Sequence, residues 1–292
     1  MKRAQKENGR TVLVTGASGG LGRAVCARLA DRGYRVLACD ISPSEPEDER
    51  IVPIRLDVTD QQSVDECVRQ AQQHTDCLHA VINLAGVFLM TTLSEGGADA
   101  LSRALEVNVV GMCRLNSAVM PLLKPGRSRV INMSSEIGRY SPQPFNGPYA
   151  VSKHAVDAYT DVIRRELMFA GIPVCKIQAG SFGTQMLTAA RSQYDRLLED
   201  TRLYRHELTV LAPIMTGELE KGYDPAIFAR MIDRQLRRRR PKRCVRIKNS
   251  FKLSLLDMLP EGAQDVAYKA ALRVFGWFIK DESKPTTTDD KE

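Results

Sequence analysis

Short apolar runs alternate with longer amphipathic segments through the first 180 residues of the chain. Runs of five or six apolar residues predict strands that are buried on both faces, and apolar residues at helical spacing predict the helices between them. Strands are expected at 10–15, 34–39, 51–56, 78–83, 129–133 and 172–177. Helices are expected after the first glycine-rich turn and over about 60–73, 97–123 and 147–170.

This alternation predicts an α/β fold, with a single Rossmann-type doubly wound parallel sheet covered by helices on both faces. Residues 181–222 follow the sixth strand, where such folds place their ligands, and we interpret them as a helical substrate cover. The expected divisions are a flexible N-terminus at 1–9, the Rossmann-type domain at 10–253, a C-terminal amphipathic helical extension at 254–280 and a disordered tail at 281–292.

The composition is that of a soluble globular protein. It is 43% hydrophobic, and no apolar run reaches the roughly 18 residues that cross a membrane. The first ten residues are polar and basic, unlike a secretory signal. Seven cysteines follow no metal-binding or disulfide pattern, which is typical of reduced thiols. We therefore expect a cytoplasmic protein with no metal site.

The net charge of +7 comes from one segment near the C-terminus. Residues 230–252 contain eleven Lys or Arg and one Asp. The apolar extension follows directly, and two interpretations stay open. The segment holds the chain peripherally at an anionic membrane surface, or it is a solvated helix face with an element that packs on the core or on a second subunit. A basic run alone does not predict nucleic-acid binding, and none is expected.

A glycine loop, Thr15-Gly16-Ala17-Ser18-Gly19-Gly20-Leu21-Gly22, joins the first strand to the first helix. Glycine permits a tight turn and a close approach to phosphate, and the helix N-terminus faces the anion, so the loop predicts a dinucleotide site. Asp40 closes the second strand, where a carboxylate accepts from a ribose 2′-hydroxyl and repels a 2′-phosphate. NAD is therefore favoured over NADP. Asp57, after the third strand, could accept from adenine or cap the next helix.

Tyr149 and Lys153 lie four residues apart, on one face of the predicted helix at 147–170. An ammonium beside a phenol is expected to lower the pKa of the phenol, giving a proton donor and acceptor that works near neutral pH. Ser134 and Ser135 precede this pair. Together with the glycine loop, these residues predict redox chemistry on an alcohol or a carbonyl.

Six ordered motifs between residues 10 and 185 resemble those of the short-chain dehydrogenase/reductase family. They are Thr15-Gly16-x3-Gly20-x-Gly22, Asn83-Leu84-Ala85-Gly86, Asn108 before Val109-Val110-Gly111, Ser134-Ser135, Tyr149-x3-Lys153 and Ala179-Gly180-Ser181-Phe182-Gly183-Thr184. The stretches at 131–135 and 164–167 are similar to the branch with retinol, steroid and hydroxybutyrate dehydrogenases.

The resemblance implies a role for each catalytic residue. Tyr149 exchanges the proton of the substrate oxygen, Ser135 binds that oxygen, Lys153 holds the nicotinamide ribose, and Asn108 holds a water that links Lys153 to solvent. The expected cofactor-binding residues are Gly16, Ser18, Gly20, Leu21, Gly22, Asp40, Asp57, Val58, Asn83, Ala85, Gly86, Tyr149, Lys153 and Thr184.

Three positions depart from the family pattern. Ser135 precedes Tyr149 by one residue more than usual, which leaves Ser134 as an alternative. Leu84 stands where the family usually has asparagine, and Ala179 where it has proline. None of these changes removes a catalytic group.

Apolar residues in the substrate cover suit a lipid-like substrate. The candidate wall residues are Met90, Phe145, Phe182, Met186, Leu187, Tyr194, Leu197, Leu198, Leu203, Tyr204, Leu208, Leu211 and Met215. We predict an NAD(H)-dependent oxidoreductase that interconverts an alcohol with a ketone or aldehyde of steroid or retinoid type. The alternatives are a sugar-nucleotide epimerase or dehydratase with tightly bound NAD, a short hydroxy-acid dehydrogenase, and a cofactor-binding scaffold without catalysis. The resemblance also implies a homodimer or homotetramer formed through the helices near 100–123 and 147–170.

Overall fold

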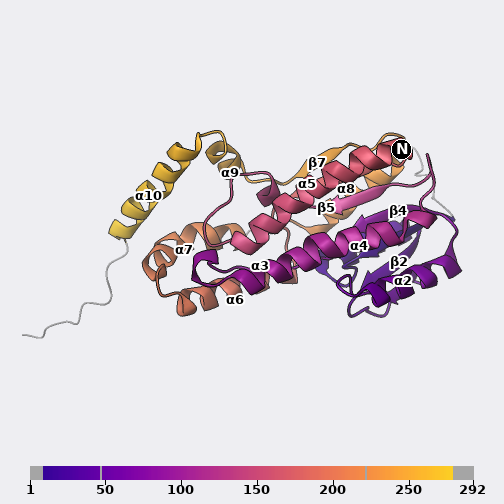
Figure 1. The fold of residues 1–292 in the computed structure, drawn as a ribbon, viewed down its shortest axis with the longest axis horizontal. Helices are drawn as coiled ribbons and strands as arrows, with labels where there is room; N and C mark the ends of the chain where they lie inside the picture. Colours follow the sequence, from indigo (N-terminus) through magenta and orange to yellow (C-terminus); the bar gives the residue numbers. More distant parts are fainter. Residues whose placement is uncertain (1–8, 47, 221, 279–292) are drawn as a thin grey trace, which may run out of the picture.

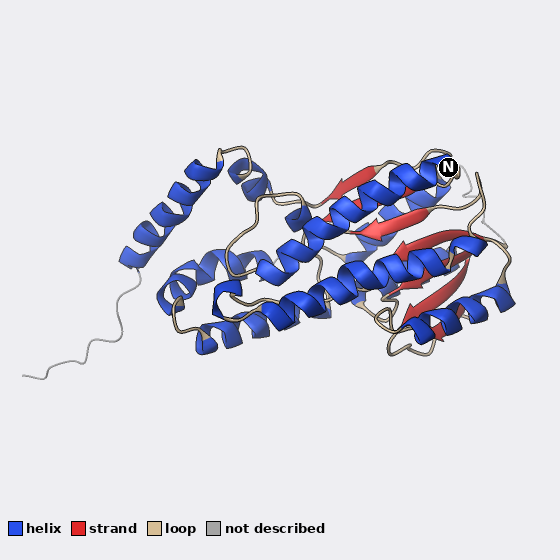
Figure 2. Cartoon of the chain, in the orientation of Figure 1, coloured by secondary structure: helices blue, strands red, loops and turns tan. Residues whose placement is uncertain are grey.

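The computed structural model of the protein describes residues 9–46, 48–220 and 222–278. Parallel strands form one sheet in the order β3-β2-β1-β4-β5-β6-β7, with helices on both faces (Figures 1 and 2). The strands are β1 (Thr11–Thr15), β2 (Arg35–Asp40), β3 (Ile51–Arg55), β4 (Leu78–Asn83), β5 (Val130–Met133), β6 (Val174–Ala179) and β7 (Cys244–Ile247). The helices are α1 (Gly20–Asp31), α2 (Gln61–His74), α3 (Ala98–Leu105), α4 (Gly111–Ala118), α5 (Gly147–Phe169), α6 (Gln185–Asp200), α7 (Arg205–Glu220), α8 (Pro225–Arg237), α9 (Phe251–Leu256) and α10 (Glu261–Phe278).

The predicted doubly wound parallel sheet is confirmed, with two differences in its elements. The seventh strand, β7, was not expected. The helical stretch expected over 97–123 consists of α3, a π-helical turn at Glu106–Val110, α4 and a 3-10 turn at Met120–Leu122, and the π-helical turn was not expected. The expected tail at 281–292 and nearly all of the expected flexible N-terminus lie outside the described residues. No described helix is both long and apolar enough to cross a membrane.

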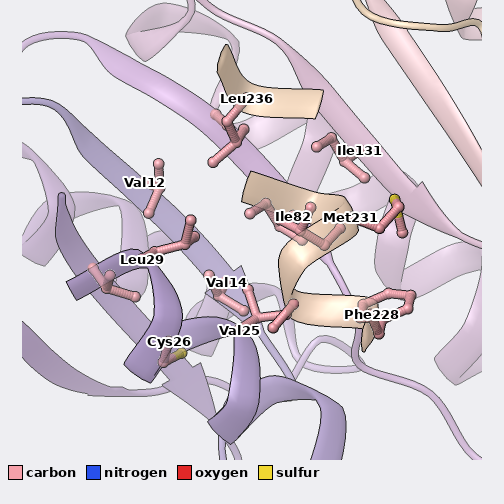
Figure 3. Packing of buried hydrophobic residues seen from close by; sticks show 14 of the residues in the cluster. Val12, Val14, Val25, Cys26, Leu29, Ile82, Ile131, Phe228, Met231 and Leu236 are labelled. Carbon is pink, nitrogen blue, oxygen red and sulfur yellow. The ribbon is translucent and has the colours of Figure 1, made fainter. Parts of the chain in front are cut away.

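Successive residues of the central strand β1 face opposite layers of helices. Val12 and Val14 pack with residues of α1 and α8, including Leu29 and Phe228 (Figure 3). Leu13 packs on the other side of the sheet, in the cluster that contains Leu115 of α4. All of these side chains are fully buried. Both faces of the sheet are therefore closed, and the carboxyl ends of its strands are left for the site.

A buried aspartate joins α1 to α8. Asp233 is fully buried, and its carboxylate lies 3.0 Å from Arg28, 3.2 Å from Arg32 and 3.0 Å from Arg237. Three guanidinium groups therefore compensate one buried negative charge. Part of the basic segment at 230–252 is thus a structural element that pairs with Asp233 and packs on the core.

We expect Asp233→Asn to lower the free energy of unfolding by about 3 kcal/mol, because it leaves three clustered arginines without their counter-charge. Denaturant or thermal unfolding measures this loss. Glu66→Gln serves as the control, because Glu66 pairs with Arg69 on the exposed surface of α2, where such a pair contributes less than about 1 kcal/mol. Equal losses in the two variants would contradict the role of Asp233.

Candidate active site and dinucleotide cleft

The glycine loop turns so tightly that Gly16 and Gly22 leave no room for a side chain. Gly16 has φ +64°, and a Cβ on Gly22 would lie 2.0 Å from the carbonyl oxygen of Gly16. Thr15 Oγ1 accepts hydrogen bonds from the N–H groups of Leu84 (3.1 Å) and Ala85 (3.0 Å). These contacts hold the second predicted motif against the first, at the carboxyl ends of β1 and β4.

A cleft of about 550 Å³ opens between the glycine loop and the start of α6. Its walls include Gly20, Thr184 and the side chains of Arg23 and Arg191. A Cβ on Gly20 would lie 2.7 Å from the Thr184 side chain. A helix N-terminus with two arginines nearby suits a pyrophosphate. The cleft and its glycine floor therefore fit a dinucleotide.

Asp40 lies beside this loop, as the NAD interpretation requires. Its two carboxylate oxygens accept from the N–H groups of Ser18 (3.0 Å) and Ser42 (3.1 Å). The Ser18 hydroxyl donates to the carbonyl of Ser42 (2.8 Å). The carboxylate is thus held at the rim of the glycine loop with lone pairs left for a ribose hydroxyl.

Asp57 forms a local turn. Its Oδ1 accepts from the N–H of Thr59 (2.9 Å) and from its hydroxyl (2.6 Å). These hydrogen bonds from Thr59 lower the pKa of Asp57. Asp60 caps α2 by accepting from Gln62 N at 3.0 Å, so the cap is Asp60 and not Asp57. Val58 is buried and lies against Gly111, the first residue of α4. A Cβ on Gly111 would lie 2.6 Å from the Val58 side chain.

Asn83 is buried within the fold, and its side-chain amide is engaged by other elements. Its amide donates to Asn116 Oδ1 (2.9 Å) and to Asn132 Oδ1 (2.8 Å), in a buried network that continues to Tyr159 and Thr160. Its side chain therefore packs β4 against β5 and α4. Ala85 of the same motif lies against Gly16 of the glycine loop, and Gly86 lies against Asn108.

Tyr149, Lys153 and Ser135 converge at the carboxyl end of β5. Ser135 is close enough to Tyr149 to lower its pKa, and its hydroxyl donates to the carbonyl of Ala179 at 3.5 Å. Lys153 Nζ lies 5.6 Å from the centre of the Tyr149 ring and donates to the carbonyl of Met133 at 3.3 Å. Ser134 instead directs its hydroxyl to the carbonyl of Lys153 (3.4 Å). Of the two candidate serines, Ser135 is the one beside the tyrosine.

The pKa of Tyr149 lies above its ordinary value in this structure, whereas Lys153 was expected to lower it. Burial raises the pKa of Tyr149, the hydrogen bond with Ser135 lowers it, and the charge of Glu136 raises it. Burial also lowers the pKa of Lys153 to about 8, against a smaller opposing effect of Asp157. The site therefore disfavours charge on both groups, because neither is well solvated.

Asn108 is fully buried in the π-helical turn between α3 and α4. Its Oδ1 accepts from Val87 N (2.8 Å), and its amide donates to the Val87 carbonyl (3.0 Å) and to Ser152 Oγ (2.9 Å). A Cβ on Gly86 would lie 3.0 Å from Asn108 Oδ1 and 3.8 Å from Lys153 Nζ. Asn108 thus fixes the segment after β4 close to Lys153.

The predicted substrate wall is divided among several places in the fold. Leu211 is buried, and the side chain of Met215 lies outside those that the structure describes. Phe182 belongs to the core, where its ring meets that of Phe228 at 5.6 Å. Leu187 lines the dinucleotide cleft, while Met186 and Leu203 are exposed. A separate cluster gathers between α6, α7 and the two loops that approach them, and it contains Met90, Phe145, Tyr194, Leu197, Leu198, Tyr204 and Leu208.

Two residues near Tyr149 were missed in the sequence. The centres of the Phe88 and Tyr149 rings lie 4.7 Å apart. In the sequence, only the position of Phe88 shortly after Gly86 could have indicated that it lies near the site. Glu136 is buried directly after Ser135 and accepts from Ser250 N.

A second contact of the C-terminal segment reaches the same loop. Asp257 Oδ1 accepts from the N–H and hydroxyl of Ser141 (2.9 and 3.2 Å). The C-terminal segment is therefore fastened to the loop that follows Ser135.

The family model described as short chain dehydrogenase matches residues 10–195. This range contains the glycine loop, Asp40 and the converging residues Ser135, Tyr149 and Lys153. The chain belongs to the short chain dehydrogenase family. Members of this family bind a nicotinamide dinucleotide, which the cleft and the glycine loop fit.

Relatives within the family include human retinol dehydrogenase 5, which is 36% identical over 182 residues that cover 59% of this chain and 57% of that protein. Human 17-beta-hydroxysteroid dehydrogenase type 6 is 30% identical over 190 residues, which cover 62% of this chain and 59% of that one. The matched region thus spans less than two thirds of either relative's length.

The short chain dehydrogenase fold is also seen in the solved structure of levodione reductase. It superposes with a TM-score of 0.70 at 21% identity, covering 85% of this chain and 98% of that one. At this level of identity the likeness supports the arrangement of the sheet and helices alone.

Proposed function

We propose that this chain is an NAD(H)-dependent oxidoreductase that interconverts a hydrophobic alcohol with its ketone or aldehyde. The observation that carries the proposal is the convergence of Ser135, Tyr149 and Lys153 in a fold that also carries a cleft suited to a dinucleotide. Lys153 Nζ lies 5.6 Å from the centre of the tyrosine ring, and Ser135 is close enough to act on the pKa of Tyr149. Both human relatives described above are named as dehydrogenases.

Each residue has a distinct task in this reaction. A nicotinamide held by Lys153 and Thr184 would supply the acceptor or donor of the hydride. Tyr149 Oη takes the proton from the substrate hydroxyl during oxidation and returns it during reduction. Ser135 Oγ orients the substrate oxygen towards Tyr149, and Lys153 holds the ribose and exchanges the proton with solvent along the Asn108 side. Orientation and proton transfer are therefore the protein's contributions.

A lipid-like substrate is supported by Phe88, which lies beside Tyr149, and by the apolar cluster between α6 and α7. Phe88 covers one side of the tyrosine ring, and the rings of Phe145 and Tyr204 meet at 5.3 Å within the α6–α7 cluster. The names of the two human relatives refer to a retinoid and a steroid alcohol. We propose that this chain takes a substrate of the same size and polarity.

NAD is the proposed cofactor because Asp40 is held at the rim of the glycine loop. We expect the protein to bind NADH more tightly than NADPH. Asp40→Ala should weaken NADH roughly tenfold or more, since a charge-assisted hydrogen bond contributes about 1.5–3 kcal/mol, and should leave NADPH unchanged or improved. Fluorescence titration of both dinucleotides measures this, with the partly exposed Asp48→Asn as the control. Tighter NADPH binding by the wild type would refute the proposed preference.

We propose that the protein forms a homodimer or homotetramer. It is supported by apolar side chains exposed on α5 and on the π-helical turn, where Val110 is 42%, Val162 52% and Phe169 87% exposed. Helices with uncovered apolar positions of this kind suit a symmetric contact between copies.

The segment considered for membrane contact is divided by the fold. Residues 238–243 lie at the amino end of β7, whereas α9 and α10 follow its carboxyl end. Apolar side chains exposed on this C-terminal part include Phe251, Leu255, Met258 and Val266. We propose that any peripheral membrane contact involves α9 and α10, separately from the arginines at 238–243.

A further inference from the structure

A cavity of about 350 Å³ lies at the amino edge of the sheet, the end opposite Tyr149. Its wall is built from the loop before β5, the second half of α5, the start of β6 and the loop between α8 and β7. These segments lie together at the end of the molecule that carries the N-terminus (Figure 1). The cavity is separate from the dinucleotide cleft, which opens at the carboxyl ends of the strands.

Five arginines line this cavity, and no aspartate or glutamate does. They are Arg129, Arg164, Arg239, Arg240 and Arg243. In the described part of the chain, no carboxylate lies within 4.0 Å of the guanidinium groups of Arg239, Arg240 or Arg243. Arg164 has only a long contact with Asp161, at 3.6 Å.

Other basic residues of the same segment have structural partners. Arg237 pairs with buried Asp233 at 3.0 Å, Arg246 Nε donates to Gln178 at 3.4 Å, and Lys248 lies 4.4 Å from the centre of the Tyr223 ring. The fold thus sorts the basic segment into residues that stabilise it and residues that gather around the cavity.

Arg129 anchors the cavity from inside the protein. It is only 8% exposed, and Nη1 donates to the carbonyl oxygens of Gln235 (2.9 Å) and Arg238 (3.0 Å) at the end of α8. Its charge also reaches neighbouring groups. Burial and, to a smaller extent, the charges of Arg129 and Arg10 together lower the pKa of His79 to about 4. A positive potential therefore extends through this edge of the sheet.

We infer that this cavity, here called the arginine pocket, binds a small organic phosphate. The planar guanidinium group matches phosphate oxygens in pairs, and several arginines around one cavity suit a dianion. The apolar part of the wall, which includes Met168 and Pro241, suits the carbon portion of a phosphate ester. The phosphate group belongs to a soluble ester or to the headgroup of a phosphorylated lipid.

Inorganic pyrophosphate tests the pocket by isothermal titration of the full chain, with and without NADH to cover the dinucleotide cleft. We expect binding that persists with NADH and weakens with added salt. The double variant Arg239→Gln/Arg243→Gln changes two exposed side chains and should reduce affinity at least tenfold. The control Arg69→Gln/Arg196→Gln removes two exposed arginines elsewhere and should retain it.

A second arm separates the two sources of phosphate. Flotation uses phosphatidylcholine vesicles with and without a phosphorylated inositol lipid. Pyrophosphate binding without flotation supports a soluble ester, and flotation that depends on both the phosphorylated lipid and Arg239 and Arg243 supports a lipid headgroup. The inference is overturned if neither probe binds, if NADH displaces pyrophosphate, or if the double variant binds as tightly as the control.

Discussion

Tyr149→Phe should lower the rate of NAD⁺ reduction by about 10²–10⁴-fold, the usual contribution of general acid–base catalysis. The substitution keeps the ring that packs on Phe88 and removes only the oxygen that contacts Ser135. Binding of NADH should remain nearly unchanged, because the cleft is formed by the glycine loop and α6. Steady-state kinetics with an active steroid or retinol substrate measures the rate, and fluorescence titration measures the binding.

Tyr223→Phe is the matched control for this experiment. Tyr223 is 43% exposed, and its ring lies 4.4 Å from Lys248 Nζ, a contact that phenylalanine can keep. Its rate should equal that of the wild type. Full turnover by Tyr149→Phe, or an equal loss in both variants, would remove Tyr149 from the reaction.

Lys153→Met should abolish most activity and yet raise the free energy of unfolding at pH 7. Burial lowers the pKa of Lys153 to about 8, so at pH 7 the folded protein holds a charge that the site disfavours. The unfolded lysine has a pKa near 10.5. The difference corresponds to about 3 kcal/mol, an upper figure for the gain on removing the charge.

The pH dependence gives the sign of this effect. Between pH 8 and 10.5 the unfolded wild type binds more protons at position 153 than the folded one, so the stability of the wild type rises with pH in this window. Lys153→Met lacks this gain. Its advantage over the wild type should therefore be full below pH 8 and fade as the pH rises to 10.5, as measured by denaturant unfolding.

Lys176→Met provides the opposite case. Lys176 is also buried, but its ammonium lies 3.1 Å from Asp157 and 3.0 Å from Asp161. Removing it leaves carboxylates without their partner, so this variant should be less stable than the wild type. If both lysine variants lose stability at pH 7, the charge of Lys153 is not disfavoured in the fold.

The sheet could be predicted because its central strands are covered on both faces and are therefore apolar throughout. β7 escaped prediction because it is an edge strand of four residues, only partly buried, with Arg246 within it. The break between α3 and α4 was missed for another reason. The π-helical turn depends on Asn108 bonding to Val87, a partner that helical periodicity does not reveal.

Within the site, the motif spacing predicted which residues converge, but it could not predict how their environment acts on them. The direction of the Asn83 side chain depends on Asn116 and Asn132, which come from other elements. The pKa of Tyr149 depends on its burial in the folded protein more than on the nearby Lys153. The arginine pocket likewise forms from segments that are far apart in the sequence.

Transfer of deuterium from a labelled alcohol to the dinucleotide tests the central claim most directly. The protein would be incubated with NAD⁺ and a panel of steroids and retinol, each labelled at the carbinol carbon. We predict that mass spectrometry detects deuterated NADH with the wild type and with Tyr223→Phe, and almost none with Tyr149→Phe. Tight binding of NAD⁺ with no deuterium transfer from any alcohol of the panel would contradict the proposed oxidoreductase.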